Sequence, residues 1–393
     1  MGAAARNQRR LFTALHRVLS VLVFAVLPAV VTLALLGNGL ARGPFLYDFK
    51  GGLYGAGTDI VHGDNPYRPA YLERQAAVKR EGERPETIIS VPVYPALPLL
   101  AAVPFSFLPY RVAGVFFALL SIGALLGALR LLGVRDWRCY GVAFMSWPVA
   151  HGLMLGALTP LLVFGAAAAW RFRSQVWPPA LAVAAIVSAK LFPWPLAVWL
   201  LATHRARAFV IATTVALGGT LAAWAAIGFD GLRDYPSMLS NLSYVSEDVG
   251  VSLVAGLIAL GVSAALAKSI AFLVAGGLLI AAWRFARRPD GDRRAYGIAV
   301  IAALVASPMV WPHYLALLFV PIALVSPRLS WLWLTPLLAY VAPVAQTSGR
   351  TWVIPLYLAI VAAPLVRLLP WPAAGAPWAL KPARVTGESR LNA

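Results

Sequence analysis

The stretch that decides the fold is residues 18–38, which read VLSVLVFAVLPAVVTLALLGN. This run holds no charged side chain, and it has about the 20 residues that a helix needs to cross a bilayer. A secretory signal peptide has a shorter apolar region and a cleavage site with small residues, and neither feature is found here. We therefore predict a retained first helix whose N-terminal tail, residues 1–17, lies in the cytoplasm.

Apolar runs of this kind recur to the end of the chain. The 393 residues are 60% hydrophobic and only 12% charged, whereas a soluble protein has about 25% charged residues. We predict an all-α, polytopic integral membrane protein without a soluble domain, with one transmembrane domain over 18–369. About twelve transmembrane helices are expected, at 18–38, 112–132, 139–154, 157–170, 177–189, 191–202, 209–228, 266–285, 296–307, 312–325, 330–346 and 352–369.

The net charge of +18 fits this topology better than it fits a nucleic-acid partner. Basic residues collect in the cytoplasmic loops of membrane proteins, and the chain has no basic soluble domain that could bind nucleic acid. With twelve crossings, the arginine-rich short loops share one side with both tails. We therefore place the protein in the plasma membrane, with 370–393 as a disordered cytoplasmic tail.

The acidic residues fall mostly in two long loops on the outer side, at about 39–111 and 229–250. Within the first loop, residues 91–109 are apolar but contain five prolines, which remove backbone donors and break helices. We expect 91–109 to be a re-entrant or surface segment. A kinked crossing is the alternative, but it would place the basic loops outside.

One carboxylate lies just beyond the first span, in the stretch FLYDFK at 45–50. Asp48 is placed among aromatic side chains at the membrane boundary, where an idle charge is unfavourable. Asp59 and Asp64 follow it, and Asp64 belongs to a Gly-Asp-Asn-Pro sequence that is ordinary turn chemistry. Asp48 is therefore either solvated or directed at a substrate within the lipid layer, and we favour the second reading.

Three further polar residues interrupt apolar surroundings on the same predicted side. Lys190 is an isolated charge between two spans, and a lysine there either extends to the interface or binds an anion. His313 and His151 lie at the outer ends of their spans. No His-x-x-x-His pair occurs, and Cys139 is the single cysteine, so we predict no protein-bound metal.

Five short motifs give the chain a resemblance to a known group. They are GDNPY at 63–67 after Asp48 and Tyr54, VYPALP at 93–98, GALTPLL at 156–162, AKLFP at 189–193 and SPMVWPHY at 307–314. In this order, over roughly residues 18–370, they resemble the GT-C glycosyltransferases. They are closest to glycosyltransferase family 87, the polyprenyl-phosphate-mannose-dependent α-mannosyltransferases. A nucleotide-binding Gly-x-Gly-x-x-Gly after a strand is absent.

The resemblance implies a GT-C bundle and an inverting transfer on the extracytoplasmic side. The donor is a polyprenyl-phosphate sugar, with mannose as the expected sugar, and the acceptor is a glycolipid or a cell-envelope glycan. Asp48 is then the general base, with Asp59 as the alternative because the Asp48-to-Gly63 spacing is longer than usual. No cofactor is expected, although a divalent cation stays open. The residues expected to contact substrate are Lys190, His313, His151, Tyr54, Tyr67, Tyr94 and Trp311.

A transporter or flippase of lipid-linked sugars, without catalysis, is the alternative function. Such a protein would also hold charged groups in a cavity. Transporters usually show charges near the membrane midplane or two related halves, and neither feature is clear in this chain.

Overall fold

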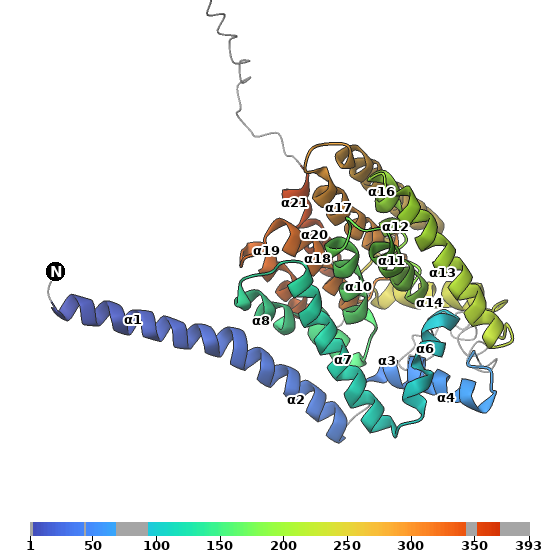
Figure 1. The fold of residues 1–393 in the computed structure, drawn as a ribbon, viewed down its shortest axis with the longest axis horizontal. Coiled ribbons are helices and arrows are strands. Elements are labelled where there is room, and N and C mark those ends of the chain that lie inside the picture. The colour runs from blue at the N-terminus through green and yellow to red at the C-terminus, as the bar shows by residue number, and fades with distance from the viewer. Residues whose placement is uncertain (1–2, 43–44, 68–92, 343–351, 370–393) are drawn as a thin grey trace, which may run out of the picture.

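The computed structural model describes residues 3–42, 45–67, 93–342 and 352–369, and every regular element in these ranges is helical. Figure 1 shows the first helix extending far from a compact body of helices. It combines α1 (Ala3–Val21), the π-helical turn η1 (Leu22–Val26) and α2 (Leu27–Arg42). The predicted tail at 370–393 and much of the first outer loop, 68–92, lie outside the described residues.

The first helix reaches the body at the turn η1. Pro28 has no backbone N–H to offer the carbonyl of Phe24, and Gly141 of α8 (Trp137–Met145) packs directly against that carbonyl. A side chain at Gly141 would collide with the backbone there. The contact therefore requires glycine, and it joins the first helix to the rest of the chain.

Four helical stretches are long and apolar enough to span a membrane. They are residues 12–41 of the first helix, α7 (Tyr110–Leu131), α13 (Ala206–Ala226) and α16 (Ala264–Ala286). A fifth exists if α9 (Trp147–Leu155) and α10 (Thr159–Arg171), bent by 119°, are counted together. The described residues thus confirm an all-helical protein with four or five helices long and apolar enough to cross a membrane, but they do not confirm the predicted twelve.

The remaining predicted spans are short helices, several of which contribute heavily to the buried core. Prolines lie at the starts of several of them, as at Pro195 and Pro312. They are α11 (Trp177–Ala189), α12 (Pro195–Ala202), α17 (Gly291–Ala306), the 3₁₀-helix η3 (Pro312–Leu318), α18 (Phe319–Val325), α19 (Trp331–Leu334), η4 (Thr335–Val341), α20 (Val353–Ala362) and α21 (Leu365–Leu368).

Both predicted outer loops contain helices, which the sequence analysis did not expect. Residues 47–62 form α3 (Tyr47–Phe49), η2 (Lys50–Tyr54) and α4 (Gly55–His62), and the second loop holds α14 (Tyr235–Val249), followed by α15 (Leu253–Ala259). Met238 and Leu242 lie one turn apart on α14 and are buried, so an apolar stripe drives this helix onto the body. The proline-rich segment contains α6 (Ala96–Ser106), whose eleven residues extend for only about 16 Å.

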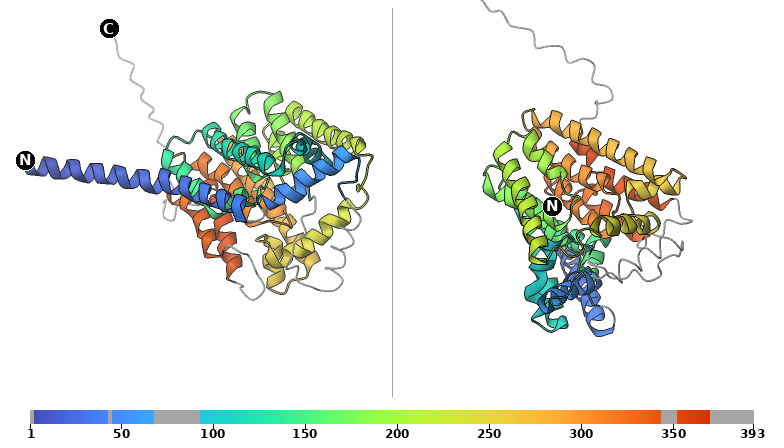
Figure 2. Two further views of the ribbon diagram at one scale, coloured as in Figure 1. Left: turned by 90° about the horizontal axis from the view of Figure 1, so that it is seen from below. Right: turned by 90° about the vertical axis from the view of Figure 1, so that its right-hand side faces the viewer.

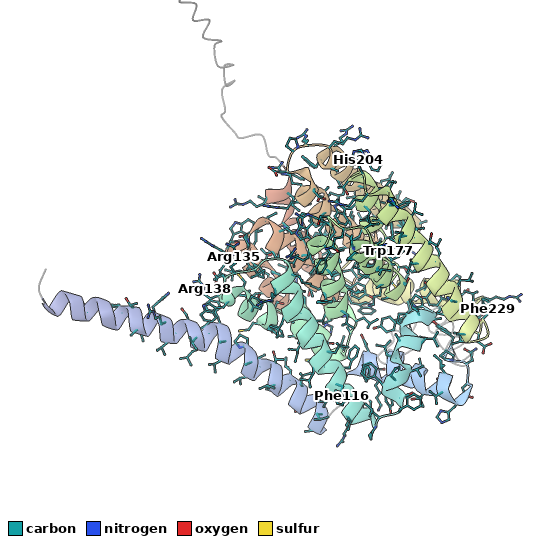
Figure 3. All side chains as sticks on the ribbon, viewed as in Figure 1. Phe116, Arg135, Arg138, Trp177, His204 and Phe229 are labelled. Carbon is teal, nitrogen blue, oxygen red and sulfur yellow. The ribbon has the colours of Figure 1, made fainter. Side chains whose placement is uncertain are left out.

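The long helices α7 and α13 have similar axis directions, although the chain runs along them in opposite senses (Figure 3). Figure 3 shows Arg135 beyond one end of α7 and Phe116 near the other, with His204 and Phe229 in the matching positions for α13. The basic ends of both helices therefore lie on the same side of the molecule.

Candidate active site

A cavity of about 640 Å³ lies where the segment after the first helix meets the middle of the chain. Its size falls in the range of about 300–1,000 Å³ that is typical of ligand sites. Polar and aromatic side chains from distant parts of the sequence line it, among them Tyr47, Asp48, Tyr94, His151, Lys190, Tyr235, Lys268, Trp311, His313 and Tyr314.

Asp48 is held by the packing of the residues on either side of it, in α3 and at its N-cap. Leu46, in a left-handed conformation with φ of 50°, and Phe49 are both fully buried. The Phe49 ring stacks on Phe117 at 4.5 Å between centroids. Gly156, the left-handed C-cap of α9, fits beneath them, since a Cβ there would lie 2.7 Å from Leu46 Cβ and 2.8 Å from Phe49 Cβ. This packing fixes the backbone that carries the carboxylate.

Lys190 faces the same cavity from the break between α11 and α12. It is 8% exposed, and its Nζ donates a hydrogen bond of 2.7 Å to Tyr314 Oη. Nζ also lies 5.3 Å from the centre of the Tyr94 ring. The Phe192 ring stacks on Tyr314 at 5.0 Å, so the partner of the ammonium group is itself held in place.

The Asp48 carboxyl group and the Lys190 ammonium group interact electrostatically. Burial raises the pKa of Asp48 from its ordinary value to about 6, although the positive charge of Lys190 opposes this shift. A carboxylate with such a pKa is a better proton acceptor near neutral pH than a solvated aspartate.

Two histidines complete this side of the cavity. His313 is 3% exposed, and neither of its ring nitrogens has a hydrogen-bond partner among the described residues. His151 Nδ1 is likewise buried and unpaired, and the two ring centres are 5.6 Å apart. Buried polar groups are rarely left unpaired because the loss costs about 1–3 kcal/mol. A polar ligand in the cavity could satisfy them.

The structure divides the predicted site residues into two groups. Asp48, Lys190, His313, His151, Tyr94 and Trp311 line the cavity, whereas Asp59, Tyr54 and Tyr67 do not. Asp59 lies in α4, and the Tyr54 hydroxyl donates 2.9 Å to the carbonyl of Leu108.

Tyr67 supports the cavity wall from behind. It is 1% exposed, and its hydroxyl donates a 2.7 Å hydrogen bond to the carbonyl of Tyr94. Its ring stacks on Trp224 at 5.0 Å, and the hydroxyl of neighbouring Tyr235 donates to the carbonyl of Val93. Tyr67 thus holds the segment that carries Tyr94 without reaching the cavity itself.

Several residues that line the cavity were not predicted from the sequence, among them Tyr314 and Lys268. Tyr314 adjoins His313 within a motif that was already quoted, so its position was a usable signal. Lys268 is a lone charge near the start of the apolar helix α16, which is the same kind of anomaly that identified Lys190. Among the described residues, no group of three or more histidine, cysteine, aspartate or glutamate side chains could hold a metal ion.

Comparison with known proteins gives one match. The family model of glycosyltransferase family 87 matches residues 93–312, which is more than half of the chain. The matched stretch includes Tyr94, His151, Lys190 and Trp311, while Asp48 and His313 lie outside it. No curated protein and no solved structure gave a significant match.

Proposed function

The chain belongs to glycosyltransferase family 87 and is a membrane glycosyltransferase; on that premise we propose that it transfers mannose from a polyprenyl-phosphate donor. The acceptor is a glycolipid or a cell-envelope glycan on the extracytoplasmic side of the plasma membrane. The observation that carries this proposal is the meeting of Asp48, Lys190 and His313 in one cavity. A carboxylate base for the acceptor hydroxyl and hydrogen-bond donors or a positive charge for the phosphate are the groups that this reaction needs.

In the proposed reaction, the Asp48 carboxylate removes the proton of the acceptor hydroxyl as its oxygen attacks the anomeric carbon. A new bond forms between this oxygen and the sugar, and the bond from the sugar to the phosphate oxygen breaks. The electron pair leaves with the polyprenyl monophosphate, and the configuration at the anomeric carbon inverts. Because the leaving group is already a phosphate, no general acid is required.

Negative charge increases on the phosphate as it departs. Lys190 supplies a positive charge that Tyr314 holds by a 2.7 Å hydrogen bond. The His313 ring nitrogens have no hydrogen-bond partner in the described part of the chain and can bind a phosphate oxygen through an N–H group. Groups that are fixed in advance stabilise such charge more strongly in the transition state than mobile solvent does. We therefore assign the phosphate to the Lys190 and His313 side of the cavity, with Asp48 facing the acceptor hydroxyl.

The charge distribution supports an extracytoplasmic site. Arg130 and Arg135 lie at or just beyond the C-terminal end of α7, and Arg205 immediately precedes α13. The positive-inside rule favours a cytoplasmic position for such a basic side. The segment that carries Asp48 connects the other end of the first helix to α7 through α6. It therefore belongs to the opposite side.

The test is product formation by the purified full-length protein with a panel of radiolabelled polyprenyl-phosphate sugars and envelope lipids as acceptors. We expect transfer from the mannose donor and an α-linkage in the product. A labelled product from a different sugar would correct the donor and keep the reaction. Movement of the labelled lipid across proteoliposomes without any new glycosidic bond would instead favour the transporter reading.

A further inference from the structure

A separate cleft lies on the basic side of the molecule, between the first helix and the start of α8. Its volume is about 460 Å³. His16, Arg17, Ser20 and Val21 of α1 line one wall, and Asp136, Trp137 and Arg138 line the other. Figure 2 shows the N-terminal part of α1 extending away from the body, so the two walls diverge from the point where η1 packs against α8.

The cleft carries an uncompensated positive charge. Asp136 is the acidic side chain among the lining residues. The Arg138 guanidinium binds its carboxylate through Nε at 3.0 Å and Nη2 at 2.8 Å. The backbone N–H of Leu329 also donates to Asp136. These hydrogen bonds, chiefly that from Arg138, lower the pKa of Asp136 to about 2. Arg17 is exposed and has no ion-pair partner among the described residues.

Below these charges the cleft opens onto apolar surface. Val18, Val21 and Leu22 are each about half exposed on the first helix. Trp137 is 45% exposed, and its ring meets Phe24 edge-on at 6.2 Å. These side chains belong to the beginning of a candidate membrane span, so they offer an apolar surface of the kind that contacts lipid acyl chains.

We propose that this cleft binds an anionic phospholipid from the cytoplasmic leaflet. The phosphate lies against Arg17 and the edge of the Arg138 guanidinium, and the acyl chains follow Val18, Val21 and Leu22 between the helices. Basic pockets between membrane helices on the cytoplasmic side bind acidic headgroups in this way. The bound lipid fills a gap that the protein leaves between its first helix and its body. This inference does not depend on the sugar-transfer reaction.

The experiment measures lipid retention by the purified full-length protein with native mass spectrometry. The probes are phosphatidylglycerol and phosphatidylcholine with identical acyl chains. The variant is Arg17→Gln, and the matched control is Arg207→Gln, which removes another exposed arginine from the same basic side, near the start of α13. Each basic residue near a membrane surface contributes about 1 kcal/mol to anionic lipid binding, which is roughly a five-fold change in affinity.

We expect the wild-type protein to prefer phosphatidylglycerol and Arg17→Gln to weaken that binding about five-fold. Arg207→Gln should leave it within two-fold, and phosphatidylcholine binding should be equal in all three proteins. Equal retention of the two lipids by the wild type would overturn the proposal. Equal losses in the two variants would also overturn it, because they would show a diffuse basic surface with no site in the cleft.

Discussion

Replacing Tyr314 with phenylalanine isolates the contact that holds the cavity lysine. The change removes the oxygen that accepts the 2.7 Å hydrogen bond from Lys190 Nζ. The aromatic ring at this position stacks on Phe192 and can keep its place. A hydrogen bond to a charged group contributes about 1.5–3 kcal/mol, and each 1.4 kcal/mol corresponds to a tenfold change in rate. We therefore expect kcat/KM to fall by about 10- to 100-fold.

The loss should appear mainly in kcat. The positive charge matters most when the phosphate gains negative charge in the transition state, and interactions that strengthen there act on kcat more than on KM. The assay is steady-state transfer from a radiolabelled lipid-phosphate sugar. Tyr54→Phe is the matched control, because it also deletes a hydroxyl bonded to a neighbour, the Leu108 carbonyl at 2.9 Å, but away from the cavity.

We expect Tyr54→Phe to retain activity within about two-fold, since hydrogen bonds between neutral groups contribute only ~1 kcal/mol to stability. Full activity in Tyr314→Phe would refute the reasoning that Lys190 is positioned by this hydroxyl. An equal loss in the two variants would do so as well, because it would point to general damage to the fold.

Three further predictions follow from the same contacts. Since the Asp48 pKa is raised to about 6 and the base must be deprotonated, kcat/KM should rise with pH through a midpoint near 6; a midpoint near 4 would contradict this. Gly156→Ala should reduce kcat strongly, because the new Cβ would lie 2.7 Å from Leu46 Cβ and displace α3. Unchanged kinetics would show that the packing of Gly156 against α3 does not position Asp48. Asp292→Asn should lower the free energy of unfolding by about 1–3 kcal/mol, since Asp292 accepts hydrogen bonds from Arg205 at 2.8 and 3.1 Å. An unchanged melting temperature would argue against a stabilising role for this ion pair.

The sequence predicted most helices because apolar runs and prolines mark them directly. Residues 177–189 were predicted as a helix and form α11 with the same bounds, and α7, α13 and α16 each differ by three residues or fewer. The count of spans could not be obtained in this way, because a run of 8–16 apolar residues describes a buried helix as well as a crossing.

The helices inside the predicted loops were missed for a related reason. Residues 47–62 are rich in glycine and carry polar groups, which favour turns, yet Phe49 and Leu53 bury one face of this segment against the body. The packing of these two side chains outweighs the local preference. The sequence could suggest where the apolar residues lie, but it could not show which surface would receive them.

Motif order identified the segments of the candidate site, but it could not give side-chain directions. Lys190, His313 and Asp48 come from distant parts of the chain, and all three line one cavity. Tyr67 was expected to contact substrate, yet its hydroxyl points to the Tyr94 carbonyl instead. Tyr314 lies in a quoted motif beside His313, but the sequence does not indicate that its hydroxyl would meet a lysine 124 residues away.

The most direct test of the account compares Asp48→Asn with Asp59→Asn in the purified protein, using initial rates of sugar transfer. General bases contribute about 10²- to 10⁴-fold to rates, so Asp48→Asn should lose at least 100-fold in kcat while it still binds the lipid donor. Asp59→Asn, altered in α4 outside the cavity, should remain within a few-fold of wild type. Near-normal transfer by Asp48→Asn, or a large loss in Asp59→Asn alone, would contradict the assignment of the base.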